Sequence, residues 1–207
     1  MIVIDGIYYA AALLAAGALV SWLAGVAYAL PLWLLAVFCL YFFRDPERQV
    51  PSGSVAVAPA DGKVVAVKRE SATVNRVSIF LNIFDVHVNR APIGGTIRDV
   101  QYHEGQFHVA SREECSEQNE QNVVTVEGDG TSIVFKQIAG LIARHIVFHK
   151  HPGDRVSTGE RVGLIKFGSR VDVLFGPEWE IAVSPGMRVA AGSSVIARRR
   201  EGHAHGA

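Results

Sequence analysis

The sequence predicts a mainly β protein behind an N-terminal apolar helical segment. Three observations lead to this fold class: an uncharged run between residues 6 and 43, short runs after residue 50 in which apolar and polar residues alternate, and an internal repeat near the C-terminus. Alternation with a period of two is typical of half-buried strands. We therefore expect a membrane-associated helical segment over residues 1–50 and a β-rich catalytic or binding domain over residues 51–207.

The N-terminal segment has no charged residue from Gly6 to Phe43, and Arg44 and Arg48 follow it. About 20 apolar residues are long enough to span a bilayer. Pro31 is expected to break or kink the helix, which leaves either one span followed by an interfacial piece or a helical hairpin. The arginines predict that the following domain lies on the cytoplasmic side of the cell membrane. We interpret the segment as a retained anchor, not a cleaved signal peptide.

The β-rich domain is predicted to consist of short strands. Residues 123–127 and 131–137 flank Gly128-Asp-Gly130, which predicts a hairpin with a tight turn. The polar segment 111–122 is expected to be an exposed loop or a short helix. Further strands are predicted at residues 55–57, 63–67, 76–82, 96–102, 143–148, 161–167, 171–175 and 180–183.

Composition and residue spacing argue against a nucleic-acid partner, a disulfide framework and a metal site. The formal net charge is zero and no basic stripe with interleaved aromatic residues is present, so nucleic acid is not expected as a partner. The two cysteines, Cys39 and Cys115, cannot build a disulfide framework or a metal site by themselves. His145, His149 and His151 would share one face of an extended segment, but no carboxylate accompanies them, and we expect no metal.

An internal repeat relates residues 152–162 to residues 185–195. Both copies have Pro, Gly, Arg, Val, Gly and Val at the same positions, and each predicts a turn, a short loop and the beginning of a strand. The pattern resembles the turns of lipoyl and biotinyl domains. We therefore expect a sandwich or barrel-sandwich-hybrid-like domain with lipoyl-like repeat turns.

Three Gly-Ser steps occur, at residues 53–54, 168–169 and 192–193. The first lies in a linker and the third belongs to the repeat. Gly168-Ser169 lies between two strand-like runs and has neither explanation. A serine held in such a turn can attack the carbonyl of the preceding peptide bond if a base activates it. The step is therefore a candidate site of self-cleavage.

Five motifs in order carry a resemblance to a known family. The chain resembles the phosphatidylserine decarboxylase proenzymes in their short form. The matching segments are Tyr41-Phe-Phe-Arg-Asp-Pro-Glu-Arg48, Ala58-Pro-Ala-Asp-Gly-Lys63, Phe84-Asp-Val-His-Val-Asn-Arg-Ala-Pro92, Gln137-Ile-Ala-Gly-Leu-Ile-Ala-Arg144 and Phe167-Gly-Ser-Arg-Val-Asp172.

The resemblance implies autocatalytic cleavage at Gly168-Ser169 into a β chain of residues 1–168 and an α chain of residues 169–207. Gly168 would supply the scissile carbonyl, and Ser169 would become a pyruvoyl group that forms a Schiff base with the substrate amine. The implied reaction is decarboxylation of phosphatidylserine to phosphatidylethanolamine in membrane lipid. A homo-oligomer of αβ units, and no metal, are expected with it.

The resemblance also implies roles for Asp61 and His87. Asp61 matches a charge-relay aspartate, although from propensity alone it would be read as a turn residue. His87 matches a functional histidine that handles protons. Longer family members have a second histidine where this chain has Arg90, and an arginine does not act as a base. Arg90 is therefore a candidate for substrate binding, and either His87 or another histidine activates Ser169.

A different class of function remains open from the sequence. Membrane-anchored adaptors and lipoylated carrier modules also place lipoyl-like β modules behind an anchor, without catalysis. That alternative explains the anchor and the repeat. It does not explain the context of Asp61 or of Gly168-Ser169.

Overall fold

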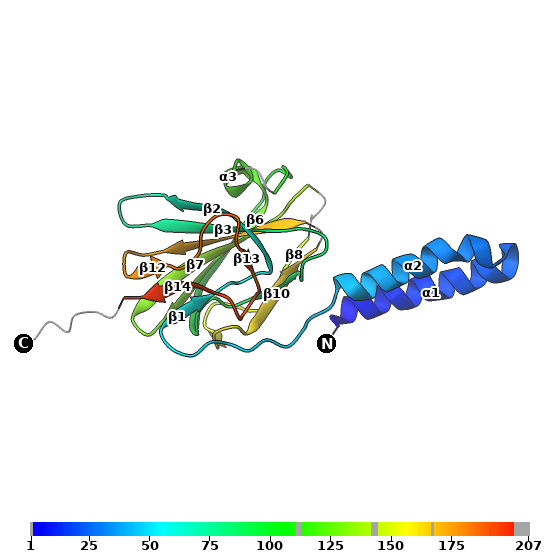
Figure 1. Ribbon diagram of the computed structural model, residues 1–207, viewed down its shortest axis with the longest axis horizontal. Helices are drawn as coiled ribbons and strands as arrows, with labels where there is room; N and C mark the ends of the chain where they lie inside the picture. Colours follow the sequence, from blue (N-terminus) through cyan, green and yellow to red (C-terminus); the bar gives the residue numbers. More distant parts are fainter. Residues whose placement is uncertain (1, 111–112, 142–144, 167, 201–207) are drawn as a thin grey trace, which may run out of the picture. The chain divides into compact units, whose positions relative to one another are not determined.

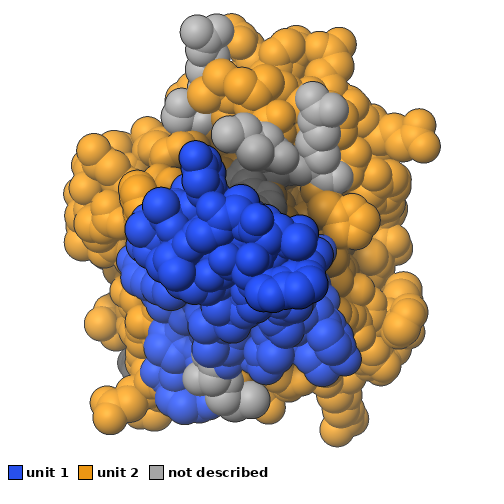
Figure 2. Space-filling model, turned by 90° about the vertical axis from the view of Figure 1, so that its right-hand side faces the viewer, with its two compact units in different colours: residues 1–47 blue, residues 48–207 orange. Residues whose placement is uncertain are grey.

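The computed structural model describes residues 2–110, 113–141, 145–166 and 168–200. The chain divides into two compact units, Met1–Glu47 and Arg48–Ala207, which Figure 2 shows in different colours. The first unit is helical and the second consists mostly of strands (Figure 1). The predicted fold class, a mainly β protein behind an apolar N-terminal helix, is confirmed.

The first unit is a hairpin of two helices, α1 (Ile4–Ala24) and α2 (Val26–Phe42). The chain reverses at Gly25, whose φ of 103° is a value that residues with a side chain rarely adopt. The expected break at Pro31 is wrong, because Pro31 lies inside α2 and the reversal falls at the glycine.

The two ends of the hairpin meet, since the Val3 amide donates to the Phe43 carbonyl at 2.9 Å. This arrangement corresponds to the hairpin alternative of the sequence analysis. By length and composition α1 can cross a membrane, with 21 residues and a mean hydropathy of 1.8. The apolar character of α1 is consistent with membrane association.

The second unit contains one short helix among its described residues, α3 (Cys115–Gln118). Every stretch predicted as a strand overlaps a strand, although residues 143, 144 and 167 lie outside the described residues. Three strands were not predicted, β4, β9 and β13, and only the beginning of β14 was predicted, at the end of the repeat. The strands are β1 (Val55–Val57), β2 (Gly62–Arg69), β3 (Asn75–Leu81), β4 (Val88–Arg90), β5 (Gly95–His103), β6 (Gln121–Gly128), β7 (Thr131–Ile138), β8 (Ile146–Phe148), β9 (Arg155–Val156), β10 (Arg161–Ile165), β11 (Ser169–Phe175), β12 (Trp179–Ile181), β13 (Arg188–Val189) and β14 (Val195–Arg199).

The strand β11 lies in the middle of the largest sheet. The order of that sheet is β13-β2-β3-β11-β7-β6-β5-β9, and smaller sheets have the orders β1-β14-β12 and β4-β10-β8. β11 pairs antiparallel with β3 on one side and β7 on the other. One face of these three strands supplies fully buried apolar side chains to the core, among them Ile79, Phe135, Val171 and Val173. The strand that begins at Ser169 is therefore held on both edges.

The predicted hairpin is confirmed in β6 and β7, which pair from Gln121↔Ile138 to Gly128↔Thr131. Asp129 and Gly130 at its tip have φ values of 49° and 69°. Two consecutive positive φ values are those of the tight hairpin turn that an Asp-Gly step favours.

The internal repeat is also a structural repeat. Gly153 and Gly186 both have a φ of 97°, and Gly159 and Gly192 have φ values of 75° and 74°. The short strands β9 and β13 follow the first glycine of each copy and pair with β5 and β2. The matching backbones explain why the same residues recur in both copies. The further likeness to lipoyl domains stays a prediction.

The repeat extends to two segments that each begin with Ala-Pro. The Gly159 amide donates to the Ala91 carbonyl, and the Gly192 amide donates to the Ala58 carbonyl, both at 2.8 Å. Asp61 follows Ala58, and Gly94 stands at the equivalent place after Ala91. A glycine, Gly94, is sufficient for the turn at this position of the repeat. The turn therefore does not require the carboxylate of Asp61.

The segment 111–122 is only partly as predicted. It contains the short helix α3, as one alternative proposed, but Cys115 is fully buried and Ser116 is 6% exposed. The helix alternative is confirmed, and the segment is exposed only in part, because Cys115 and Ser116 pack against buried charged side chains of the sheet. Residues 111 and 112 lie outside the described part of the chain.

Candidate active site

The Gly168-Ser169 step forms the beginning of β11. Gly168 has a φ of 67°, in the left-handed region, while a Cβ on it would meet no other atom within 4 Å. Glycine is therefore required there for conformation and not for space. Ser169 follows in extended backbone and pairs with Leu81 of β3. The peptide bond between the two residues joins a left-handed glycine to a strand that is paired on both edges.

The hydroxyl of Ser169 is buried without a hydrogen bond. Ser169 is 0% exposed, and its Oγ has no partner among the described residues. Because successive side chains of a strand point to opposite faces, Ser169 shares the apolar face of Val171 and Val173. An unsatisfied buried polar group costs about 1–3 kcal/mol. A buried hydroxyl without a partner needs an explanation, and a reactive role next to the left-handed Gly168 supplies one.

His87 contacts the backbone of Gly168. Its side chain is buried, at 2% exposed. The ring Nδ1 is 2.9 Å from the carbonyl oxygen of Asp85, and Nε2 is 3.3 Å from the backbone nitrogen of Gly168. A carbonyl only accepts, so Nδ1 carries the proton and Nε2 accepts from the Gly168 amide. The histidine thus presents an unprotonated nitrogen to the residue that precedes Ser169.

Asp61 is bound on two sides. Its carboxylate accepts from Arg48 Nη2 at 2.8 and 3.1 Å, and from the Ala191 amide at 2.7 Å. Burial raises the pKa of Asp61, the Ala191 hydrogen bond and the Arg48 charge oppose that shift, and the charge of nearby Asp85 adds to it. Asp61 therefore lies close enough to Asp85 to sense its charge, and Asp85 in turn holds the His87 ring.

Asp85 is a member of the site that sequence reasoning did not select. Its carboxylate accepts from the Asn82 amide at 2.9 Å and from Arg188 at 2.5 Å. These bonds fix the turn before His87. A sequence signal for Asp85 was present, because it stands two residues before His87. Its ion pair with Arg188 could not be predicted, because Arg188 lies about 100 residues further along the chain.

Arg90 lies where the two copies of the repeat cross. It is 5% exposed, its Nη1 donates to the Gly159 carbonyl at 3.1 Å, and a Cβ on Gly192 would come within 2.8 Å of its Cδ. These contacts show that Arg90 packs within the repeat, and the substrate-binding role predicted for it stays a prediction. The structure brings His87 to Gly168, places Asp61 near Asp85, and places Arg90 against Gly159 and Gly192 of the repeat.

The other face of β11 carries a buried network of charges. Arg170 and Asp172 are joined at 2.6 Å, and Arg76 of β3 reaches Asp172 at 3.0 Å. Ser116 of α3 donates to Asp172 at 2.7 Å, and Arg170 donates to Ser78 at 2.7 Å. The network therefore fixes the strand that follows Ser169 from the side opposite the core.

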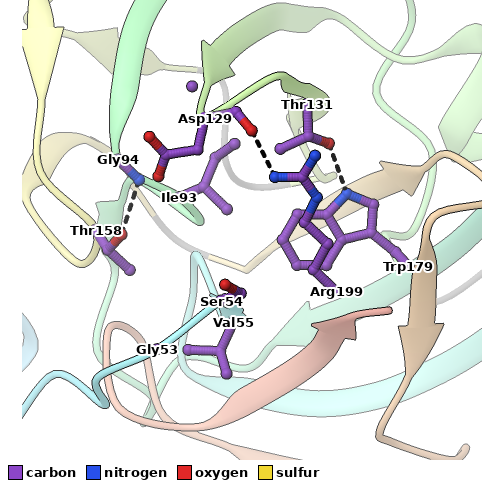
Figure 3. Close-up of a pocket in the computed structure, with 11 residues that line it drawn as sticks. Gly53, Ser54, Val55, Ile93, Gly94, Asp129, Thr131, Thr158, Trp179 and Arg199 are labelled. Atoms are coloured by element: carbon purple, nitrogen blue, oxygen red, sulfur yellow. Dashed lines mark hydrogen bonds between the residues drawn. The ribbon is translucent and has the colours of Figure 1, made fainter. Parts of the chain in front are cut away.

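A small cavity lies away from these residues. Figure 3 shows it between the β6–β7 hairpin, β14 and the linker at Gly53, with a volume of about 60 Å³. Trp179 Nε1 donates to Thr131 Oγ1 at 2.9 Å, and Gly94 donates to Thr158 Oγ1 at 2.7 Å. None of the candidate site residues lines it, so it is not a substrate pocket for them.

No cluster of three or more potential metal ligands occurs within the described residues. The candidate site consists instead of the Ser169 hydroxyl, the histidine next to Gly168, and the two aspartates behind that histidine.

Comparison with known proteins agrees with the family resemblance found in the sequence. Residues 35–197 match the family model described as phosphatidylserine decarboxylase. A phosphatidylserine decarboxylase proenzyme of Solibacter usitatus is 73% identical over 198 residues, which cover 96% of this chain and 97% of that protein. Proenzymes of the same name are 45% identical in Nitrosomonas eutropha, over 87% of both chains, and 46% identical in Magnetococcus marinus, over 81% of this chain and 80% of the other.

The fold, the site and these relatives define a carboxy-lyase that is made as a proenzyme and depends on a pyruvoyl group derived from a serine. The chain belongs to the phosphatidylserine decarboxylase family. The predicted family and enzyme class are confirmed, and the adaptor and carrier alternatives lose their basis.

Proposed function

We propose that the chain cuts itself between Gly168 and Ser169 and then converts phosphatidylserine to phosphatidylethanolamine. The observation that carries the proposal is the buried Ser169 hydroxyl without a partner, directly after a left-handed glycine whose amide meets His87. The cleavage begins when the Ser169 Oγ bonds to the Gly168 carbonyl carbon and the bond from that carbon to the Ser169 nitrogen breaks, which leaves an ester, while the hydroxyl proton passes through the base to the freed nitrogen. The chain is cut when residue 169 loses its Cα proton and its Cβ–Oγ bond breaks, so that Oγ leaves on the Gly168 carboxylate and residue 169 becomes dehydroalanine. Its imine tautomer then adds water and releases ammonia, which leaves the pyruvoyl group.

The surroundings of Ser169 fit the pyruvoyl group that its conversion would leave. The residue lies on the apolar side of a central strand, where water is excluded, and no described hydrogen bond would be lost when its hydroxyl oxygen departs. The pyruvoyl group supplies an electron sink for the loss of carbon dioxide. His87 Nε2 lies next to the new chain end and can hold or return a proton there.

Asp61 and Asp85 are assigned supporting roles in this proposal. Asp85 orients the His87 ring through its carbonyl oxygen, and Asp61 contributes a negative charge close to Asp85. Such a charge favours a protonated imidazole, which is the form that His87 takes while it holds the serine proton. We therefore assign to Asp61 a role that acts on the base through Asp85.

The location of the reaction follows from the substrate class. A lipid substrate has its headgroup at the membrane interface, and α1 is apolar and long enough to anchor the chain there. We place the second unit on the cytoplasmic side, because Arg44 and Arg48 follow the apolar hairpin. The homo-oligomer of αβ units stays a prediction.

The first test is the state of the purified protein. Intact mass should show two chains, residues 1–168 and 169–207, with a small chain that lacks a free amino group. The same preparation should release carbon dioxide from phosphatidylserine in mixed micelles. A single uncut chain with no decarboxylase activity would contradict the proposal.

His87→Gln should slow self-cleavage. Glutamine keeps a polar side chain of similar length but cannot take up a proton at neutral pH, and general-base catalysis typically contributes about 10²–10⁴-fold. The fraction of cut chain is followed over time after synthesis in a cell-free system. His103→Gln, at the exposed end of β5, is the matched control and should cleave at the wild-type rate. An unchanged rate in His87→Gln would assign the base to another residue.

A further inference from the structure

Gly140 lies opposite the proposed scissile residue. β7 ends at Ile138, which pairs with Arg170 of β11. Because the two strands are antiparallel, the same register places Gly140 opposite Gly168 just beyond the end of the pairing. Ala139, between Ile138 and Gly140, is held by a hydrogen bond from its amide to the Glu120 carbonyl at 2.9 Å. The backbone at residue 140 is therefore fixed close to the peptide bond that would break.

The space beside Gly140 is filled by the scissile carbonyl. A Cβ on residue 140 would overlap the carbonyl oxygen of Gly168, and it would stand 3.2 Å from the carbonyl carbon of Gly168 and 3.2 Å from Ala110 Cβ. The φ of Gly140 is not in the left-handed region, unlike that of Gly168. Gly140 is consequently required for the close approach of another backbone and not for an unusual conformation.

We propose that Gly140 is a positioning residue for self-cleavage, because the absence of a side chain at this position lets the Gly168 carbonyl sit where the Ser169 hydroxyl attacks it. The inference rests on the proposed cleavage between Gly168 and Ser169. In that step the carbonyl carbon of Gly168 changes from planar to tetrahedral, so its position relative to Oγ decides the rate. The backbone at residue 140 limits the movement of this carbonyl on one side.

Gly140→Ala tests the inference. The added methyl group has to displace the Gly168 carbonyl, and a misplacement of about 1 Å can lower a rate by roughly 10²-fold. We expect the folded variant to accumulate as uncut precursor and to cleave about 10²-fold more slowly than the wild type. The measurement is the fraction of cut chain over time, by gel and intact mass.

Gly128→Ala is the matched control. A Cβ at residue 128 would likewise overlap a carbonyl oxygen, that of Gly94, and the φ of Gly128 is also outside the left-handed region. Gly128 ends β6 at the tip of the hairpin, whereas Gly140 follows the other end of β7. Thermal denaturation should show a loss of stability in both variants, but only Gly140→Ala should cleave slowly. Equal cleavage rates in the two variants would overturn the inference.

Hydroxylamine separates the steps of the cleavage. It splits the ester that forms when the acyl group of Gly168 moves to the Ser169 oxygen, so it reports whether that first step has occurred. Gly140→Ala precursor should yield little hydroxylamine-cleaved product in the time that wild-type precursor is processed. Rapid cleavage by hydroxylamine at residue 168 would show that the ester forms normally, and would overturn the assignment of Gly140 to the attack.

A second variant keeps the inference testable if Gly140→Ala does not fold. Gly140→Ala combined with Ala110→Gly removes the neighbouring methyl group, which relieves one close contact and leaves the overlap with the Gly168 carbonyl. It should fold better than the single variant and still cleave slowly. Wild-type chain that remains uncut would overturn both this inference and the proposed function, whereas normal cleavage of the folded variants would overturn the inference alone.

Discussion

Ser169→Ala is expected to remain a single uncut chain without decarboxylase activity. The variant lacks the only atom in the proposed mechanism that attacks the Gly168 carbonyl, and it cannot form a pyruvoyl group. The fold should persist, since the deleted hydroxyl makes no hydrogen bond within the described structure. The loss of activity should equal the whole enzymatic acceleration, which is typically at least about 10⁶-fold. Intact mass and carbon dioxide release measure both effects.

Ser193→Ala is the control for the choice of serine. Ser193 also follows a glycine with a positive φ, since Gly192 has a φ of 74°. Its hydroxyl, however, donates to the Ala190 carbonyl at 3.4 Å and belongs to a turn of the repeat. This variant should cleave and decarboxylate like the wild type. Two chains from Ser169→Ala, or an uncut Ser193→Ala, would show that the wrong serine was selected.

Most of the strands could be predicted because local sequence patterns determine them. Alternation of apolar and polar residues placed the longer strands, and Gly128-Asp-Gly130 placed the hairpin tip. The helical break was misplaced since Pro31 is tolerated inside α2, and the conformational freedom of Gly25 decided where the chain reverses. Two-residue strands such as β9 and β13 are too short to show any periodicity.

In the site, too, local motifs could be recognised from the sequence, whereas contacts between residues far apart in the chain could not. Gly168-Ser169 and His87 could be selected from short motifs, but the contact of His87 with Gly168 joins residues 81 positions apart in the chain. Gly140 was part of a matching motif, yet its role depends on an approach to Gly168 that no local pattern encodes. Arg90 is a substrate-binding candidate from its chemistry, and only the fold shows that it is buried and donates to the Gly159 carbonyl, so its role toward substrate stays a prediction.

Asp172→Asn is expected to weaken the association of the two chains after cleavage. Asp172 would belong to the α chain, whereas Arg76 and Ser116, which both bind its carboxylate, would belong to the β chain. Cleavage removes the covalent link, so strand pairing, core packing and this network hold β11 in the sheet. Removal of one partner of a buried ion pair typically costs about 3–5 kcal/mol, because the remaining charges stay buried without compensation.

Self-cleavage itself should survive this substitution. Asp172 points to the opposite face of β11 from Ser169 and Val171, so the change does not touch the reacting groups. We expect a normally cut protein whose α chain dissociates, or whose unfolding in urea begins, at a lower denaturant concentration. Glu180→Gln alters an exposed carboxylate of the same chain in β12 and should leave both properties unchanged.

The pH dependence distinguishes the lost charge from a general packing defect. Burial alone would raise the pKa of Asp172, but the Arg170 charge and hydrogen bonds from Arg170, Ser116 and Ser78 outweigh it and hold the pKa below its ordinary value of 3.8. A carboxyl whose pKa is lowered by folding contributes stability above its unfolded pKa, and this contribution is lost as the pH falls through the folded pKa. The wild type should therefore lose stability below about pH 4, whereas Asp172→Asn should lack this part of the acid dependence. Parallel stability curves of the two proteins from neutral pH to pH 3 would contradict the ionic role of Asp172.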